Sequence, residues 1–425
     1  MDQQAKRFLR ITLITFVTLL ALVVAFNAVV DPYLMVGTPR MSGINAHRTK
    51  GVMDMPLLKA YEVFRVRPHT LILGSSRVGF GLDPTSLSWP TADRPVYDLG
   101  LLGGDPETAY RYLQNVNETN RLTAVVLGLE FSMFVSSRNA ILAQETEAHL
   151  STTRDGRQRS GKTWIYFRDF LDTNFSLSTL LASMSTVYSN ISDDSTDIVA
   201  GGWNAPEYDQ FIARSGVYPF FSEIDLNYFH WYAHRHWRQD SLLSVKAIIE
   251  YCQAHGIRLI VVLHPSYVDE LEMLDLLGLS GEVEDWKRAL VRVTTPYRAA
   301  GNHAPLELWD FCEYDSYTTE PAPRGKQSLQ WFVDAIHYRP ALGEKILQRI
   351  FGSGETNFGI ALTANNVESH LADIRERRQV YRETRSQDAT RVRNVYDAAL
   401  KWEAREEWPD RTQLAASPAT QTPGP

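Results

Sequence analysis

The sequence is poor in cysteine and has no strong excess of positive charge, and each shortage excludes a class of protein. Its only cysteines are Cys252 and Cys312, too few for a disulfide-dense scaffold or a four-cysteine zinc site. They can form one disulfide in an oxidising compartment or stay apart as small buried side chains. The formal net charge is -7, and no long basic stripe is present, so we expect no nucleic-acid partner.

Long apolar runs are also scarce, because only Ile11–Val30 is long enough to cross a membrane. A helix of this length spans roughly the 30 Å hydrocarbon layer. Basic residues precede the run and Asp31 follows it, so the positive-inside bias places the N-terminus in the cytoplasm and the rest outside it. A cleaved signal peptide is the alternative, but its apolar stretch is usually about 7–15 residues long. We therefore predict a single-pass anchor.

The rest of the chain alternates short apolar runs with helical patterns. Runs that suit buried parallel strands are Thr70–Leu73, Val96–Leu99, Ala124–Leu127, Arg258–Leu263 and Leu306–Trp309. The clearest helical patterns are Pro106–Val116, Leu242–His255 and Glu284–Ala299. This alternation predicts an α/β fold, with a five-stranded parallel sheet and helices on both faces. Ligands of such sheets bind at the carboxyl ends of the strands.

We expect the α/β domain to occupy residues 55–352. The segment at about 135–240 is too long for one crossover, and we interpret it as a largely helical insertion that covers one side of the site. It contains a helical pattern at Trp164–Ser189 and an aromatic cluster at Tyr218–Trp237. The expected remaining parts are a cytoplasmic N-terminus (1–10), a membrane helix (11–30), a linker (31–54), a helical C-terminal extension (353–412) and a disordered tail (413–425).

Two short motifs carry candidate chemistry. Gly74-Ser75-Ser76 follows the first predicted strand, where a sharp strand-to-helix turn can expose a serine hydroxyl. A serine helix cap is the alternative interpretation. Near the other end, Asp334 and His337 fall just before a helix that Pro340 can begin. An acid three residues before a histidine can orient one ring nitrogen and leave the other for a hydroxyl. Together the motifs predict a triad of Ser76, His337 and Asp334.

On these motifs the sequence resembles the SGNH (GDSL-like) superfamily of esterases and acyltransferases. Gly74-Ser75-Ser76 stands where that family has Gly-Asp-Ser, and Asp334-Ala-Ile-His337 matches its Asp-x-x-His block. The glycine-rich stretch Asp98–Gly104 looks like its glycine block. The resemblance implies a flavodoxin-like SGNH fold, Ser76 as nucleophile, and an oxyanion hole that includes the N–H groups of Ser76 and Gly103.

The sequence departs from the family at several positions. Ser75 replaces the aspartate of Gly-Asp-Ser, and Arg77 replaces the leucine that usually follows. Glu130 stands where the family has the asparagine that completes the oxyanion hole, and a carboxylate donates no hydrogen bond unless it is protonated. Arg77 or backbone N–H groups are candidates to replace it. The side chains expected around the pocket are Ser75, Arg77, Glu130, His264 and Tyr338.

The Gly-Ser-Ser-Arg form, the single anchor and the Asp-x-x-His-Tyr ending resemble one branch of the superfamily. Its members are anchored in the bacterial inner membrane and O-acylate exopolysaccharides or other envelope glycans in the periplasm or outside the cell. The resemblance implies an acyl donor delivered by a multispanning membrane acyltransferase, a glycan acceptor, and no cofactor. The alternatives are an esterase that uses the same site, and a non-catalytic scaffold or glycan-binding subunit.

Two other patterns invite different functions. Gly156–Thr163 satisfies a phosphate-loop pattern but lacks the preceding buried strand that such a loop requires. His230, His234 and His236 lie among aromatic residues, and we interpret that segment as a packed helix. We therefore predict no metal site.

Overall fold

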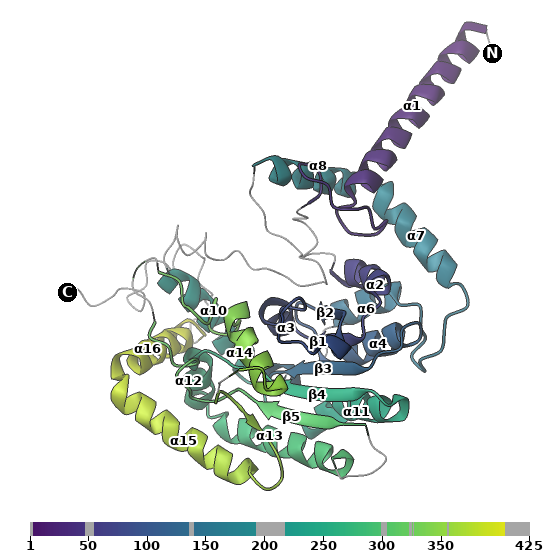
Figure 1. The fold of residues 1–425 in the computed structure, drawn as a ribbon. Coiled ribbons are helices and arrows are strands. Elements are labelled where there is room, and N and C mark those ends of the chain that lie inside the picture. The colour runs from purple at the N-terminus through teal and green to yellow at the C-terminus, as the bar shows by residue number, and fades with distance from the viewer. Residues whose placement is uncertain are drawn as a thin grey trace.

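The computed structural model describes residues 3–46, 55–135, 140–192, 217–298, 304–322, 325, 327–354 and 357–403. Helix α1 (Gln3–Val30) projects from the domain (Figure 1). Among the described residues, α1 is the one helix long and apolar enough to cross a membrane. Most of its large apolar side chains are exposed between Phe8 and Phe26. The predicted tail at 413–425 lies outside the described residues.

The centre of the domain is a mixed, mostly parallel sheet. Its strands are β1 (Thr70–Gly74), β2 (Val96–Gly100), β3 (Ala124–Leu129), β4 (Arg258–Leu263), β5 (Leu306–Asp310) and β6 (Ile360–Ala361). Their order is β2-β1-β3-β4-β5-β6. The first five strands are parallel, as predicted, and β6 pairs antiparallel to β5. The prediction of five strands was therefore wrong by one, because two residues are too short to give a periodic pattern.

Both faces of the sheet are covered, because alternate side chains of each strand point to opposite sides. On one face Leu71 and Leu73 pack within a core that includes α2 (Met55–Val66), α4 (Pro106–Asn117), α11 (Leu243–His255) and α13 (Ser280–Thr294). On the other face Ile72 packs with α3 (Ser76–Gly81), α12 (Val268–Leu276), α14 (Pro340–Phe351) and the segment before α14. Helix α13 begins four residues earlier than predicted and also ends earlier.

The segment between β3 and β4 is helical where it is described. It contains α5 (Ser132–Val135), α6 (Ala140–His149), α7 (Lys162–Asn174), α8 (Leu177–Ser192) and α10 (Val217–Tyr232). The single helical pattern expected at Trp164–Ser189 is two helices, because the chain turns at Phe175 and Ser176. Helices α7 and α8 both contact α1 and lie beside its C-terminal end (Figure 1).

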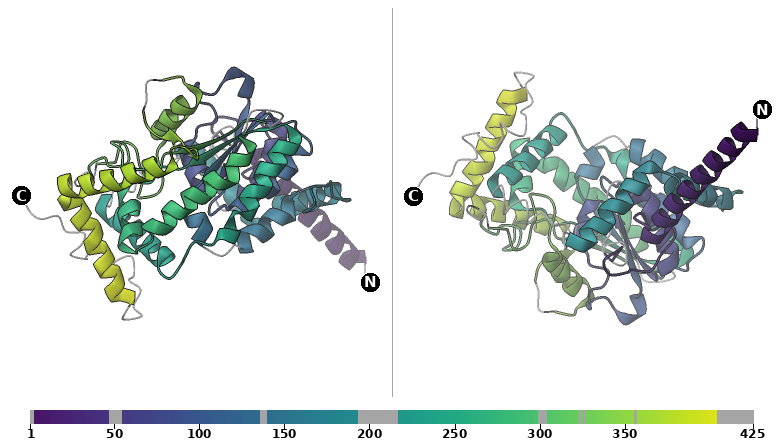
Figure 2. Two further views of the ribbon diagram at one scale, coloured as in Figure 1. Left: turned by 90° about the horizontal axis from the view of Figure 1, so that it is seen from below. Right: turned by 90° about the horizontal axis from the view of Figure 1, so that it is seen from above.

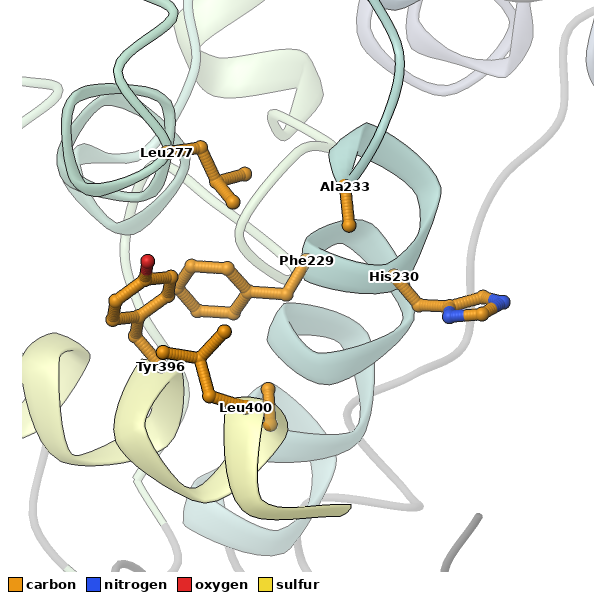
Figure 3. Close-up of a pocket in the computed structure, with 7 residues that line it drawn as sticks. Phe229, His230, Ala233, Leu277, Tyr396 and Leu400 are labelled. Carbon is orange, nitrogen blue, oxygen red and sulfur yellow. The ribbon is translucent and has the colours of Figure 1, made fainter. Parts of the chain in front are cut away.

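The C-terminal extension packs on the domain far from α1 (Figure 2). Helix α15 (Val367–Thr384) contacts α13, and α16 (Ser386–Glu403) contacts α10 and α12. Figure 3 shows the contact with α10, where the rings of Phe229 and Tyr396 pack at a tilt of 42° with centroids 5.2 Å apart. His230 points away from this small apolar pocket (Figure 3).

Candidate active site

The turn between β1 and α3 places Ser76 at the carboxyl end of the sheet. Gly74 has a φ of +153°, and a Cβ there would lie 3.0 Å from the carbonyl oxygen of Gly128. A side chain at this position would therefore strain the turn, and glycine avoids that strain. Ser75 caps α3, because its hydroxyl accepts a hydrogen bond from the backbone N–H of Arg77 at 3.2 Å. Ser76 is the first residue of the helix and is partly exposed.

A hairpin-like turn just before α14 holds Asp334 and His337. The turn is closed by a bridge between Phe332 and Tyr338 and by a hydrogen bond from the N–H of Val333 to the carbonyl of His337 at 2.8 Å. Oδ1 of Asp334 accepts the backbone N–H groups of Ile336 and His337, both at 2.8 Å. The backbone of the turn thus fixes the position of the carboxyl group independently of the imidazole. Helix α14 begins at Pro340, as predicted.

Ser76, His337 and Asp334 form one chain of hydrogen bonds across 261 residues of sequence. Oγ of Ser76 lies 2.8 Å from Nε2 of His337, and Nδ1 of His337 lies 2.7 Å from Oδ2 of Asp334. Since an ionised carboxylate only accepts hydrogen bonds, the proton of the neutral imidazole belongs on Nδ1. Nε2 is then an acceptor for the serine hydroxyl.

The surroundings of the pair favour an ionised acid. Burial alone would raise the pKa of Asp334, but attraction to His337 and hydrogen bonds from His337 and two backbone N–H groups hold that pKa below its usual value. Asp334 is almost fully buried, whereas the His337 side chain is 12% exposed. The ring of Phe80 packs against the imidazole with centroids 4.8 Å apart. The imidazole is therefore only slightly exposed, and its contacts with Phe80, Asp334 and Ser76 fix its orientation.

The loop after β2 lies beside the serine turn. The N–H of Leu101 donates to the carbonyl of Gly74 at 3.1 Å, and Gly103 is exposed with a φ of +64°. Lys59 of α2 is fully buried, and its ammonium donates to the carbonyl of Gly100 at 2.5 Å. Burial lowers the pKa of Lys59, against the attraction of Asp98. This lysine connects α2 to the glycine-rich loop, and no motif in the sequence pointed to it.

Arg77 points into a buried network rather than toward solvent. Its guanidinium donates to both carboxylate oxygens of Glu270, at 2.7 and 2.9 Å, and to the hydroxyl of Ser266 at 2.8 Å. Tyr232 of α10 donates to the same carboxylate at 2.7 Å. The pKa of Arg77 lies well above its ordinary value, because the attraction of Glu270 and Glu130 outweighs burial. The predicted role as an oxyanion donor would require this network to open.

Glu130 follows β3 and is also buried, with 8% of its surface exposed. Burial raises its pKa to about 7, although Arg77 and a hydrogen bond with Ser75 act in the opposite direction. Its Oε2 has no hydrogen-bond partner in the structure. Near neutral pH this carboxyl group is therefore divided between the protonated and ionised forms.

His264 and Tyr338 form a buried pair behind the triad. The hydroxyl of Tyr338 lies 3.1 Å from Nδ1 of His264, and both side chains are at most 1% exposed. Burial, and then the charge of Arg77, lower the pKa of His264 well below its ordinary value, so it is neutral. The five side chains expected around the pocket, Ser75, Arg77, Glu130, His264 and Tyr338, are thus all buried.

Comparison with known proteins does not assign this chain to a family. Neither a scan against protein-family models nor a search of curated proteins gives a match to this chain. Any functional conclusion therefore depends on the geometry of the residues described above.

The two cysteines, whose pairing the sequence left open, are both free.

Proposed function

We propose that this protein is a membrane-anchored, SGNH-like serine acyltransferase that O-acylates, most simply O-acetylates, an envelope polysaccharide. The observation that carries the proposal is the hydrogen-bonded chain from Ser76 through His337 to Asp334. A hydroxyl aligned with an acceptor nitrogen, whose ring is oriented by an acid, is the arrangement that activates a serine. The doubly wound strand order and the location of Ser76 after β1 agree with it.

In the first step, Oγ of Ser76 attacks the carbonyl carbon of an acyl donor while its proton moves to Nε2 of His337. Asp334 stabilises the imidazolium that results. We assign the N–H groups of Ser76 and Gly103 to the negative oxygen of the tetrahedral intermediate. The leaving group takes the proton from His337, and the acyl group remains as an ester of Ser76.

In the second step, a sugar hydroxyl gives its proton to Nε2 of His337 and attacks the acyl-serine ester. The proton returns to Oγ of Ser76 as the acylated sugar leaves. Water in place of the sugar would make the same site an esterase. In the proposal, α1 crosses the bacterial inner membrane with its N-terminus inside, and a multispanning partner supplies the acyl group. Tethering to that membrane raises the effective concentration of the two sites.

A fluorophosphonate probe tests the nucleophile directly. The purified full-length protein should be labelled at Ser76, and Ser76→Ala should abolish labelling. Ser178→Ala, which changes an exposed serine on α8, is the matched control and should be labelled like the parent. Absence of labelling in a folded parent protein would contradict the proposal and favour a scaffold or glycan-binding role.

An acetyl-ester assay then separates transfer from hydrolysis. With a chromogenic acetyl ester and an oligosaccharide acceptor, the transferase should produce an acetylated sugar detectable by mass spectrometry. Turnover that does not depend on the acceptor, with no acylated sugar, would identify an esterase. In cells, Ser76→Ala should fail to restore polymer acylation to a deletion strain.

A further inference from the structure

Helix α8 has its polar side turned inward and its apolar side turned outward. Five large apolar residues, each 56–73% exposed, recur every three or four positions and so share one helical face. They are Leu177, Leu181, Met184, Tyr188 and Ile191. The buried positions are small or hydroxylated, namely Thr179, Ala182, Ser183 and Thr186. A helix on a water-exposed surface has the opposite arrangement.

This apolar stripe begins where α1 leaves the domain. Asn27, near the end of α1, is fully buried, and its side chain bonds the hydroxyl of Ser183 at 3.0 Å and the carbonyl of Asn174 at 3.0 Å. These contacts hold α8 beside the last turn of the apolar helix (Figure 1). Because α1 is apolar and exposed up to Phe26, the stripe lies at the level where a membrane-spanning α1 would emerge from the hydrocarbon.

The composition of the region matches the boundary between lipid and water. Helix α8 contains no charged residue. On α7, Trp164 is 65% exposed and packs against Phe167 with ring centroids 5.7 Å apart. Tryptophan and tyrosine gather at the level of lipid headgroups, because their rings are apolar and their N–H or O–H groups are polar. Lys162, exposed at the start of α7, adds a positive charge that anionic lipids attract.

We propose that α8, together with the exposed aromatic residues of α7, lies in the interfacial layer of the same bilayer that α1 spans. The occupant of the stripe is lipid, since α8 packs against the last turn of α1 and the apolar side chains of α1 that precede this contact are exposed. The protein would then have two membrane contacts, one spanning and one interfacial. This contact is independent of the proposed chemistry, since it involves none of the triad residues.

The test places a fluorescent probe on the stripe of the full-length protein. Cys252 and Cys312 are replaced by alanine, and single cysteines are introduced as Leu181→Cys and Tyr188→Cys for labelling with an environment-sensitive dye. Val380→Cys is the matched control, because Val380 is 50% exposed and its helix, α15, lies far from α1 (Figure 1). Each labelled protein is reconstituted in vesicles of phosphatidylcholine and phosphatidylglycerol in equal amounts.

Dyes on α8 should lose most of their emission to spin-labelled phosphatidylcholine, and iodide in the water should quench them several-fold less than the dye at position 380. Equal iodide quenching at all three positions would overturn the proposal. Shielding that appears only in native membranes, and not in pure lipid, would indicate a membrane-protein partner and would also overturn it. So would shielding that disappears when the protein is diluted in the vesicles, because that result would indicate a second copy.

Discussion

The two oxygens of Asp334 have different tasks. Oδ1 is held by two backbone N–H groups and Oδ2 faces the imidazole of His337. The turn therefore positions the acid, and the acid positions the histidine. A substitution that keeps the backbone hydrogen bonds to Oδ1 and changes the contact of Oδ2 with His337 therefore isolates the effect of the acid on the imidazole.

Asp334→Asn is such a substitution. Its amide oxygen can still accept the backbone N–H groups, whereas its NH₂ group faces Nδ1 and favours the wrong tautomer. We expect kcat for acetyl-ester turnover to fall by about 10⁴-fold, with little change in thermal stability. Asp373→Asn, at an exposed position of α15, is the control. A loss of less than tenfold would show that Asp334 does not orient a catalytic base.

Glu130 makes the stability of the protein depend on pH. Burial raises the pKa of Glu130 in the folded state to about 7, above its ordinary value of 4.5. Between these two values the unfolded chain ionises the group and the folded chain keeps it protonated, so the unfolded state binds fewer protons. Stability is therefore lost as pH rises through this window.

Glu130→Gln should remove that dependence. Relative to the parent, the variant should gain free energy of unfolding as pH rises from about 4.5 to about 7, by up to about 3 kcal/mol. Urea unfolding in detergent at several pH values, followed by tryptophan fluorescence, measures the difference. Glu383→Gln, on the exposed side of α15, should follow the parent curve. A constant difference between Glu130→Gln and the parent across this range would contradict the shifted pKa.

The sequence predicted some residues of the candidate site well and others not at all. Ser76, Asp334 and His337 were recognisable because local signals surround them, namely a glycine at the end of a strand and a proline that begins a helix. Lys59 and Glu270 gave no such signal. Their partners are distant in sequence, and a charged residue inside an ordinary helical pattern is usually solvated. Only the tertiary structure shows that they are buried.

At the scale of elements, the turn between β1 and α3 depends on close approach of two backbones. A side chain at position 74 would meet the carbonyl of Gly128 on β3, and the backbone there has a φ that other residues rarely adopt. The same turn determines where Ser76 lies relative to His337. Stability and reactivity should therefore change together here.

Gly74→Ala tests this coupling. We expect it to destabilise the protein by about 1–3 kcal/mol and to slow fluorophosphonate labelling of Ser76. Gly281→Ala is a matched control, because Gly281 lies in α13 with no atom within 4 Å of the added Cβ; it should be neutral or slightly stabilising. Thermal unfolding and labelling rates measure the two effects. Normal labelling by Gly74→Ala would show that the turn tolerates a side chain.

Elements with a strong period were the predictable ones. Strands β1 to β5 were located within two residues at each end, because short, mostly apolar runs between helical patterns mark the strands of such a sheet. The break between α7 and α8 was missed, since Phe175 and Ser176 are not strong helix breakers. The hydrogen bonds of Asn27 with Asn174 and Ser183 link the turn between α7 and α8 to α1. The sequence around these residues does not predict such bonds, because the partners are far apart in the chain.

At the scale of the whole molecule, a buried ionic cluster joins the C-terminal extension to the domain. Arg391 of α16 donates to Asp269 of α12 and lies 3.6 Å from Asp225 of α10. Both carboxyl groups are fully buried, and burial raises the pKa of each. One cation therefore compensates acids from two separate segments of the chain.

Arg391→Met should leave those acids without a partner. We expect a loss of about 3–5 kcal/mol in the free energy of unfolding at neutral pH. The loss should shrink in mildly acidic solution, because protonated carboxyl groups need no cation. Arg393→Met, on the exposed side of the same helix, controls for the loss of charge. Thermal unfolding at pH near 5 and near 8 compares the variants, and an equal loss at both values would contradict the explanation.

The chain that follows α1 folds back at once instead of running freely into the domain. Asp31 accepts the N–H groups of Val36, Gly37 and Thr38 at 2.7–3.0 Å, and Arg65 of α2 donates to the carbonyls of Leu34 and Met35. These contacts couple the orientation of the domain to the tilt of α1. If α1 leans within the bilayer, Ser76 leans with it, so membrane thickness, which influences helix tilt, would also change the orientation of Ser76 relative to the membrane surface.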